Sequence, residues 1–313
     1  MKKVIILGNN TIGVELTKHC LEHPQIEILA VRPEPNDKGV DNWQKSLLKF
    51  CLDNRIKILN ERKLSNERFV KKIKNFNPDF IFSFQCRSII PKSIINIPKY
   101  GIINLHFAYL PKYRGCYPIA WALLNGEKEV GVTLHYIDDG IDTGDIIYQE
   151  KIPVLSKDTA RSIFDKLTNL GILIFKRKID DLLRLNIQPK KQLDREAIYY
   201  SKYSLDFSKN FINWNQNNIL VYNFIKAFIF PPYQYPQTRY KNKTFSVSKC
   251  RLSKRNFVKI QPGTIISLSN NKIVVATKKG YIDILEVIYK NKKISSLELA
   301  KVLKLKNGDI FYF

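Results

Sequence analysis

The N-terminal part of the chain alternates short apolar runs with helical patterns, and this alternation most constrains the fold. Val4–Leu7 precedes the turn Gly8-Asn9-Asn10, a helical pattern as far as Leu21, and a second apolar run at Ile26–Val31. Strand, helix and strand in this order are typical of a doubly wound α/β sheet. We therefore predict a mostly parallel sheet with helices on both faces.

The same alternation continues along the chain. We expect further strands at Lys57–Leu59, Phe80–Phe84, Gly101–His106, Gly131–Ile137 and Ile146–Ile152. Helices are expected near Trp43–Leu52, Glu67–Phe76 and Ile119–Leu124, and a long amphipathic helix from about Thr159 to Leu185 would close this part of the chain.

After Leu185 the sequence becomes polar and irregular, which suggests a linker. Beyond it we expect a short helix at Ile219–Phe228, stopped by two prolines, and then brief alternating runs typical of a small β-barrel-like domain. The predicted organisation is a catalytic domain over 1–185, a linker over 186–210 and a C-terminal domain over 211–313.

The chain is strongly basic, with 52 Lys and Arg against 28 Asp and Glu. From Ser201 onward 20 basic residues face 5 acidic ones, against 32 and 23 before it. Such an excess indicates either a phosphate-rich partner or a solvated lysine surface, and we favour the second.

Several classes of protein are excluded. No apolar run approaches the roughly 18–20 residues that cross a bilayer, and the basic start has no signal-peptide cleavage pattern, so we expect a cytoplasmic protein without membrane association. The five cysteines form no CxxC pair, and neither a disulfide framework nor a metal site is expected. Gly8 and Gly13 do not complete a GxGxxG fingerprint, so NAD and FAD are not predicted; the turn either approaches a phosphate or is structural.

Asn104 and His106 lie two residues apart at the end of a predicted strand, so their side chains point to the same side. An Asn amide can donate to an oxygen that becomes negative, and a His can move a proton near neutral pH. The loop Asp138–Asp145 could supply a carboxylate that orients the imidazole. His135 is interpreted as a core or sheet-face residue, and Arg114 as a loop anchor or a phosphate contact.

Several motifs together resemble the formyltransferase family that uses N10-formyltetrahydrofolate. They are Asn104-x-His106, Leu110-Pro-Lys-Tyr-Arg-Gly115, Asn125-Gly-Glu127, Gly131-Val-Thr133 and Asp138-x-Gly-Ile-Asp142-Thr-Gly-Asp145. The family includes glycinamide ribonucleotide transformylase, methionyl-tRNA formyltransferase and nucleotide-sugar N-formyltransferases. The resemblance covers about residues 1–185, and Ile212-Asn-Trp214 and Pro262-Gly-Thr264 resemble the β-barrel extension of the tRNA and larger sugar enzymes.

The resemblance implies direct attack of an amine on the formyl carbon of the folate. It gives Asn104 the role of stabilising the oxyanion, His106 that of handling the proton, and Asp142 that of holding His106. The pterin of N10-formyltetrahydrofolate, the expected cosubstrate, would bind Ser88, Ile89, Ile90, Asp138, Asp139, Gly140, Ile141 and Asp142. The usual small Gly-Ser after the His is Phe107-Ala108 here, so contacts near the formyl group should differ.

Three hypotheses remain for the function. The chain is a sugar N-formyltransferase, a methionyl-tRNA formyltransferase, or a non-catalytic folate- or nucleotide-binding module. The third is disfavoured because Asn104, His106 and Asp142 are all present. The tRNA enzymes carry a longer basic insertion where this chain has Arg32–Asn42, which is short and as acidic as it is basic. We therefore favour a dTDP- or UDP-linked amino-deoxy hexose used in surface polysaccharide synthesis, with tRNA as the alternative partner.

In the sugar hypothesis, further residues would contact the acceptor. Asn10, Asn223 and Lys226 are candidates for the diphosphate, and Tyr222 either stacks on the nucleotide base or belongs to the core. A homodimer through the C-terminal part is a further expectation from the family.

Overall fold

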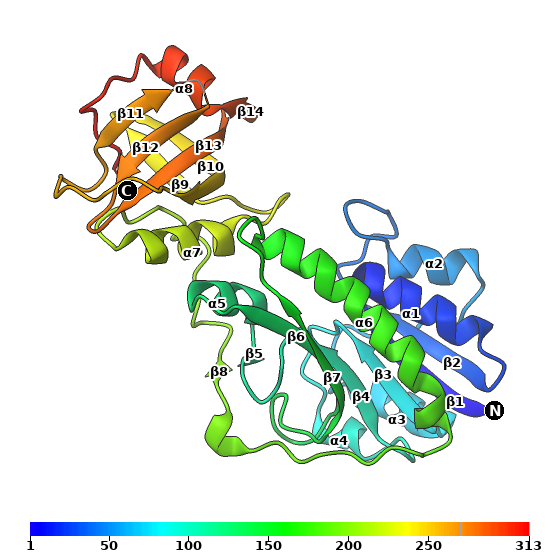
Figure 1. Cartoon of the computed structure of the whole chain (residues 1–313). Helices are drawn as coiled ribbons and strands as arrows, with labels where there is room; N and C mark the ends of the chain where they lie inside the picture. The colour runs from blue at the N-terminus through cyan, green and yellow to red at the C-terminus, as the bar shows by residue number, and fades with distance from the viewer. Residues whose placement is uncertain (270, 313) are drawn as a thin grey trace. The chain divides into compact units, whose positions relative to one another are not determined.

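The protein, described by a computed structural model over residues 1–269 and 271–312, divides into two compact units (Figure 1). The first comprises residues 1–118, 130–152 and 165–200, and the second comprises 119–129, 153–164 and the residues from 201 onward. The predicted linker contains the 3₁₀ helix η1 (Asp194–Glu196) and the strand β8 (Tyr199–Tyr200). The domain limits predicted from the sequence stay a prediction.

The first unit is built on a six-stranded sheet in the order β2-β1-β3-β4-β6-β7. Its strands are β1 (Lys2–Gly8), β2 (Ile26–Pro33), β3 (Phe80–Phe84), β4 (Ile102–His106), β6 (Glu129–Tyr136) and β7 (Ile146–Pro153). The pairs from β2 to β4 are parallel, whereas β6 runs antiparallel to β4. The predicted mostly parallel, doubly wound sheet is therefore confirmed.

Helices cover both faces of this sheet (Figure 1). They are α1 (Asn10–Glu22), α2 (Leu47–Asp53), α3 (Glu67–Phe76), α4 (Lys92–Ile95) and α6 (Ala160–Leu183). Phe175 of α6 packs edge-on against Phe82 and Phe84, while Phe69 of α3 joins a core cluster with Ile81. Because alternate residues of a strand point to opposite faces, Phe82 and Ile81 place α6 and α3 on opposite sides.

The second unit carries a six-stranded antiparallel sheet in the order β11-β12-β13-β10-β9, with β14 beside β13. Its elements are α5 (Pro118–Leu124), α7 (Asn218–Phe228), β9 (Gln237–Tyr240), β10 (Lys243–Leu252), β11 (Ile265–Ser269), β12 (Lys272–Ala276), β13 (Tyr281–Tyr289), β14 (Lys292–Ser295) and α8 (Ser296–Leu303). The core under this sheet includes Trp214, Phe245 and Phe311. A small, barrel-like C-terminal β-domain was predicted, and it is confirmed.

Within the described residues, no helix has both the length and the apolarity needed to span a bilayer.

Candidate active site

Strand β4 carries Asn104 and His106 to the carboxyl edge of the parallel part of the sheet. The antiparallel strand β6 lies next to it and places His135 directly opposite Asn104, and Thr133 opposite His106. His106 is 9% exposed and His135 only 1%. The site therefore contains a second imidazole, which the sequence analysis had left in the core or on the sheet face.

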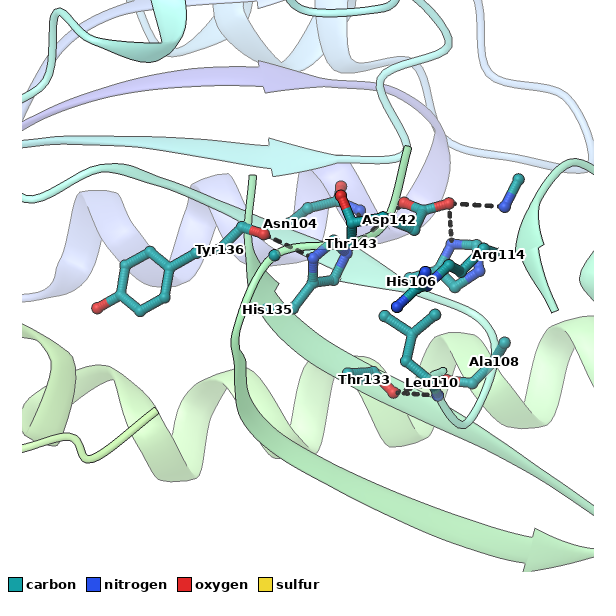
Figure 2. Close-up of polar contacts among 12 residues, drawn as sticks. Asn104, His106, Ala108, Leu110, Arg114, Thr133, His135, Tyr136, Asp142 and Thr143 are labelled. Atoms are coloured by element: carbon teal, nitrogen blue, oxygen red, sulfur yellow. Dashed lines mark hydrogen bonds and ion pairs between the residues drawn. The ribbon is translucent and has the colours of Figure 1, made fainter. Parts of the chain in front are cut away.

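The carboxylate of Asp142 lies between the two imidazoles (Figure 2). Its Oδ2 is 3.6 Å from Nδ1 of His106, and its Oδ1 is 3.6 Å from Nε2 of His135. The backbone N–H of Gly115 also donates to Oδ2 at 2.8 Å. The structure thus brings Asn104, His106 and Asp142 together.

Burial lowers the pKa of His135 to about 4, so this imidazole is neutral near pH 7. Its Nδ1 lies 2.7 Å from the backbone oxygen of Tyr136, which can only accept a hydrogen bond, so we assign the ring proton to Nδ1. Nε2 is then an acceptor, and Nδ2 of Asn104 donates to it at 3.1 Å (Figure 2). His135 consequently fixes which way the Asn104 amide faces.

The ring of His106 is held at both of its nitrogens. Nε2 lies 2.9 Å from the backbone oxygen of Tyr113 and donates to it, while Nδ1 faces Asp142. The loop that carries Tyr113 is itself tied to β6, because the Thr133 hydroxyl donates to the Ala108 oxygen at 2.7 Å and accepts from the Leu110 N–H at 3.1 Å. The arrangement orients an acid–base group beside an amide donor, which suits a reaction that passes through an oxyanion.

The two segments predicted to contact the folate, 88–90 and 138–142, lie in the same unit. An ion pair joins Asp139 of the second segment to Lys92, which begins α4 shortly after the first segment. The pair has an Nζ–Oδ2 distance of 2.6 Å. Asp138 stabilises its own turn, accepting from the Gly140 N–H and the Thr143 hydroxyl. In the Ser88–Ile90 segment Ile89 is 79% exposed, while Ile90 is buried.

The residues predicted to bind the acceptor lie in different units. Asn10 begins α1 in the first unit, and its Nδ2 donates to Oε1 of Gln85 at 2.8 Å. Tyr222, Asn223 and Lys226 lie on α7 in the second unit. All three side chains donate to backbone oxygens of that unit, those of Ser156, Leu124 and Leu155 respectively. Burial also lowers the pKa of Lys226.

Sequence reasoning missed two residues of this site, His135 as a site member and Gln192. Gln192 binds the backbone of the Asp142 loop and the Arg114 side chain. Arg114 is 7% exposed and pairs with Asp194, which favours the loop-anchor interpretation over a phosphate contact. His135 enters the site through the pairing of β6 with β4, and Gln192 through a segment that returns after α6; no local sequence pattern indicates either approach. Over residues 1–269 and 271–312 no cluster of three or more His, Cys, Asp or Glu side chains is suited to a metal ion.

The fold and this site define an enzyme of the formyl transfer class, and the comparisons with known proteins agree. Residues 2–179 match the family described as Formyl transferase, and residues 205–302 match Formyl transferase, C-terminal domain. The chain belongs to the formyl transferase family.

Similar proteins include both tRNA enzymes and sugar enzymes. The methionyl-tRNA formyltransferase of Clostridium tetani is 32% identical over 297 residues, which cover 94% of each chain. Among solved structures, WlaRD, a sugar 3N-formyl transferase in the presence of dTDP and 5-N-formyl-THF, is 32% identical with a TM-score of 0.73, covering 93% of this chain and 99% of that one. The N-formyltransferase of Helicobacter canadensis, in complex with folinic acid and dTDP-3-aminofucose, is 29% identical with a TM-score of 0.73, covering 91% and 99%.

Proposed function

We propose that the protein is a sugar N-formyltransferase, which transfers the formyl group of N10-formyltetrahydrofolate to the amine of a dTDP- or UDP-linked amino-deoxy hexose. The product would serve surface polysaccharide synthesis. The proposal is supported by the likeness to two enzymes of nucleotide-linked sugars over more than nine-tenths of the chain.

One observation carries the choice of a sugar over tRNA. In the segment 32–42, Arg32 is fully buried and pairs with the buried Glu34 at 3.3 Å. Its other guanidinium nitrogens donate to the backbone oxygens of Glu61 and Arg62. Lys38 is then the one cation of that segment left on the surface, against Asp37 and Asp41. A segment with this charge balance does not attract a polyphosphate chain.

The chemistry assigned to the site is an acyl transfer to an amine. The neutral amine nitrogen attacks the formyl carbon, forming a C–N bond and placing negative charge on the formyl oxygen. The Asn104 amide would donate to that oxygen, and His106, whose Nε2–H is bound to the Tyr113 oxygen, would take the proton from the attacking nitrogen at Nδ1. The bond from the formyl carbon to N10 then breaks, and the proton passes to N10 of tetrahydrofolate. Asp142 would keep His106 oriented and stabilise its protonated form.

The folate is expected in contact with Ser88, Ile89 and Ile90 on one side and with the Asp138–Asp142 loop on the other. The Lys92–Asp139 ion pair supports this assignment, because it links the loop to the helix that directly follows Ile90. The donor assignment also draws on the formylated folates in the two similar sugar-enzyme structures.

Methionyl-tRNA formyltransferase is the second candidate. It is favoured by the names of the similar sequences and by the basic residues that dominate the chain from Ser201 onward.

The deciding experiment is an assay of the purified chain with N10-formyltetrahydrofolate. The acceptors are a panel of dTDP- and UDP-linked 3-amino and 4-amino sugars and, separately, charged initiator tRNA. We expect a formylated sugar nucleotide, identified by mass, with stoichiometric release of tetrahydrofolate. Formylation of the tRNA and of none of the sugars would establish the second candidate instead.

Variants test the assigned roles with the best acceptor. We expect Asn104→Ala, His106→Ala and Asp142→Ala each to lower kcat at least ~100-fold, the scale of losing one preorganised donor or acid–base group. Lys112→Ala, in the neighbouring loop, is the control and should keep a near-normal rate. Near-normal turnover by all three site variants would refute the mechanism assigned to Asn104, His106 and Asp142.

A further inference from the structure

The segment that follows α6 reaches back to the Asp142 loop through Gln192. Its Nε2 donates to two backbone oxygens of that loop, to Asp142 at 2.8 Å and to Gly144 at 2.7 Å. One carboxamide therefore binds both sides of the residue that follows Asp142.

The other end of the same carboxamide is also held. Oε1 of Gln192 accepts from Nε and Nη2 of Arg114 at 3.1 and 2.9 Å. A guanidinium only donates, so the amide oxygen must face Arg114 and the amide nitrogen must face the loop. Arg114 also donates to Asp194 at 3.0 Å, which restrains the guanidinium from the side of η1.

These bonds hold Asp142 at both of its ends. Gln192 binds its backbone oxygen, and the N–H of Gly115, the neighbour of Arg114, binds its carboxylate. Restraint is needed here because Asp142 has a φ of +55°, a left-handed conformation that costs a non-glycine residue roughly 1–3 kcal/mol. The bonds from Gln192 and Gly115 are therefore restraints on this conformation.

We propose that Gln192 is a positioning residue, which acts on the reaction by fixing the backbone of Asp142 and through it the orientation of His106. The inference rests on the proposed function, in which Asp142 serves His106. Gln192 itself does not touch the reacting atoms in this assignment.

The test uses Gln192→Glu, which keeps the size of the side chain and an acceptor for Arg114 but cannot donate to the two loop oxygens. We expect kcat to fall ~10-fold or more, the usual scale for a residue that orients an active group, while the KM for the acceptor changes less than about threefold. Gln261→Glu, at an exposed site of the second unit, makes the same charge change and should leave both constants unaltered.

A double-mutant cycle separates positioning from general damage to the fold. If Gln192 acts through Asp142, then Gln192→Glu should cost no more than about twofold in an Asp142→Asn background. Hydrogen–deuterium exchange gives a readout without catalysis: the backbone amides of residues 138–145 should exchange faster in Gln192→Glu, with unchanged exchange in the C-terminal sheet.

The outcomes are distinct. A slow Asp142→Asn enzyme together with a normal Gln192→Glu enzyme overturns the inference and leaves the proposed function intact. An equal loss from Gln192→Glu in both backgrounds also overturns it, because the effect would not pass through Asp142. A normal rate for Asp142→Asn itself removes the proposed role of that carboxylate, and the inference falls with it.

Discussion

At the scale of single residues, the Asp142 carboxylate lies between two imidazoles that differ in burial and in the role we assign to each. The pKa of His135 is lowered to about 4 by burial, so this ring stays neutral and serves as a fixed hydrogen-bond acceptor. His106 is 9% exposed against 1% for His135, and it is the imidazole to which we assign proton transfer in the proposed mechanism. The neutral ring binds the Asn104 amide, and the carboxylate faces the ring that would move the proton.

This division predicts the effect of replacing His135. In His135→Phe the Asn104 amide loses the acceptor that holds it, so we expect kcat to fall ~10-fold, as for a lost orienting partner. His135→Gln, which can present an oxygen to the same amide, should recover part of the loss. His23→Gln, at a largely buried imidazole whose Nε2 lies 3.3 Å from Oδ1 of Asp180, is the matched control. A His135→Phe enzyme as fast as the wild type would show that Asn104 needs no such partner.

His135 also makes stability depend on pH, and the sign follows from its lowered pKa. Below its ordinary value of 6.5 the unfolded chain takes up a proton that the folded chain refuses until about pH 4. The contribution of His135 to the free energy of unfolding should therefore be fully present above pH 6.5 and should be lost as the pH falls toward 4. Burial lowers the pKa of His19 as well, which adds in the same direction.

Urea denaturation at several pH values measures this dependence. Between pH 6.5 and 4 the wild type should lose stability more steeply than His135→Gln, which has no titrating group there. Equal slopes for the two proteins would mean that His135 is not held neutral by the fold.

At the scale of elements, local pattern predicted most of the regular parts of the first unit, but the strand expected at Lys57–Leu59 is only a single bridge between Ile58 and Val31. The helix Glu67–Phe76 and the strand Phe80–Phe84 have the predicted limits, because a 3.6-residue period and an unbroken apolar run specify them locally. The two-residue strand β5 (Arg114–Gly115) pairs with β8, far along the chain, and neither was predicted. Such short strands carry no period of their own, and their pairing is decided by tertiary contacts.

The pairing of β5 with β8 depends on Gly115. A Cβ at this residue would lie 2.2 Å from the backbone oxygen of Tyr200, and its φ is +90°. We expect Gly115→Ala to lower the free energy of unfolding by about 1–3 kcal/mol, from strain and steric overlap together, and to lower kcat because the Gly115 N–H binds Asp142.

Gly308 provides the matched control for this prediction. It has the same φ of +90°, but a Cβ there would meet nothing within 4 Å. Gly308→Ala therefore measures the conformational strain alone, and the difference between the two variants in urea denaturation measures the close approach to β8. If both variants lost equal stability and kept kcat, the β5–β8 pair would have no part in holding Asp142.

At the scale of the whole molecule, local spacing indicates the proposed reacting groups but not the residues that hold them. Asn104 and His106 follow from their spacing at a strand end, whereas Asp142 was assigned through the resemblance to a family. His135 and Gln192 come into the site through an antiparallel strand and a returning segment, and no spacing along the chain predicts either approach.

The net charge of +24 leads to the last prediction, because the two candidate acceptors differ in how many phosphates they present. A nucleotide-linked sugar has one diphosphate, so few counterions are released when it binds. A tRNA bound through six to ten phosphate contacts would lose ~10³–10⁵ in affinity between ~50 and ~200 mM salt.

If the sugar is the acceptor, kcat/KM should fall less than ~10-fold over that range, since only one or two charges are neutralised. Nonspecific binding of tRNA, measured by a gel mobility shift, should weaken steeply over the same salt range, and the bound tRNA should not be formylated. A steep salt dependence of turnover itself would instead assign the basic surface to substrate binding and favour the tRNA enzyme.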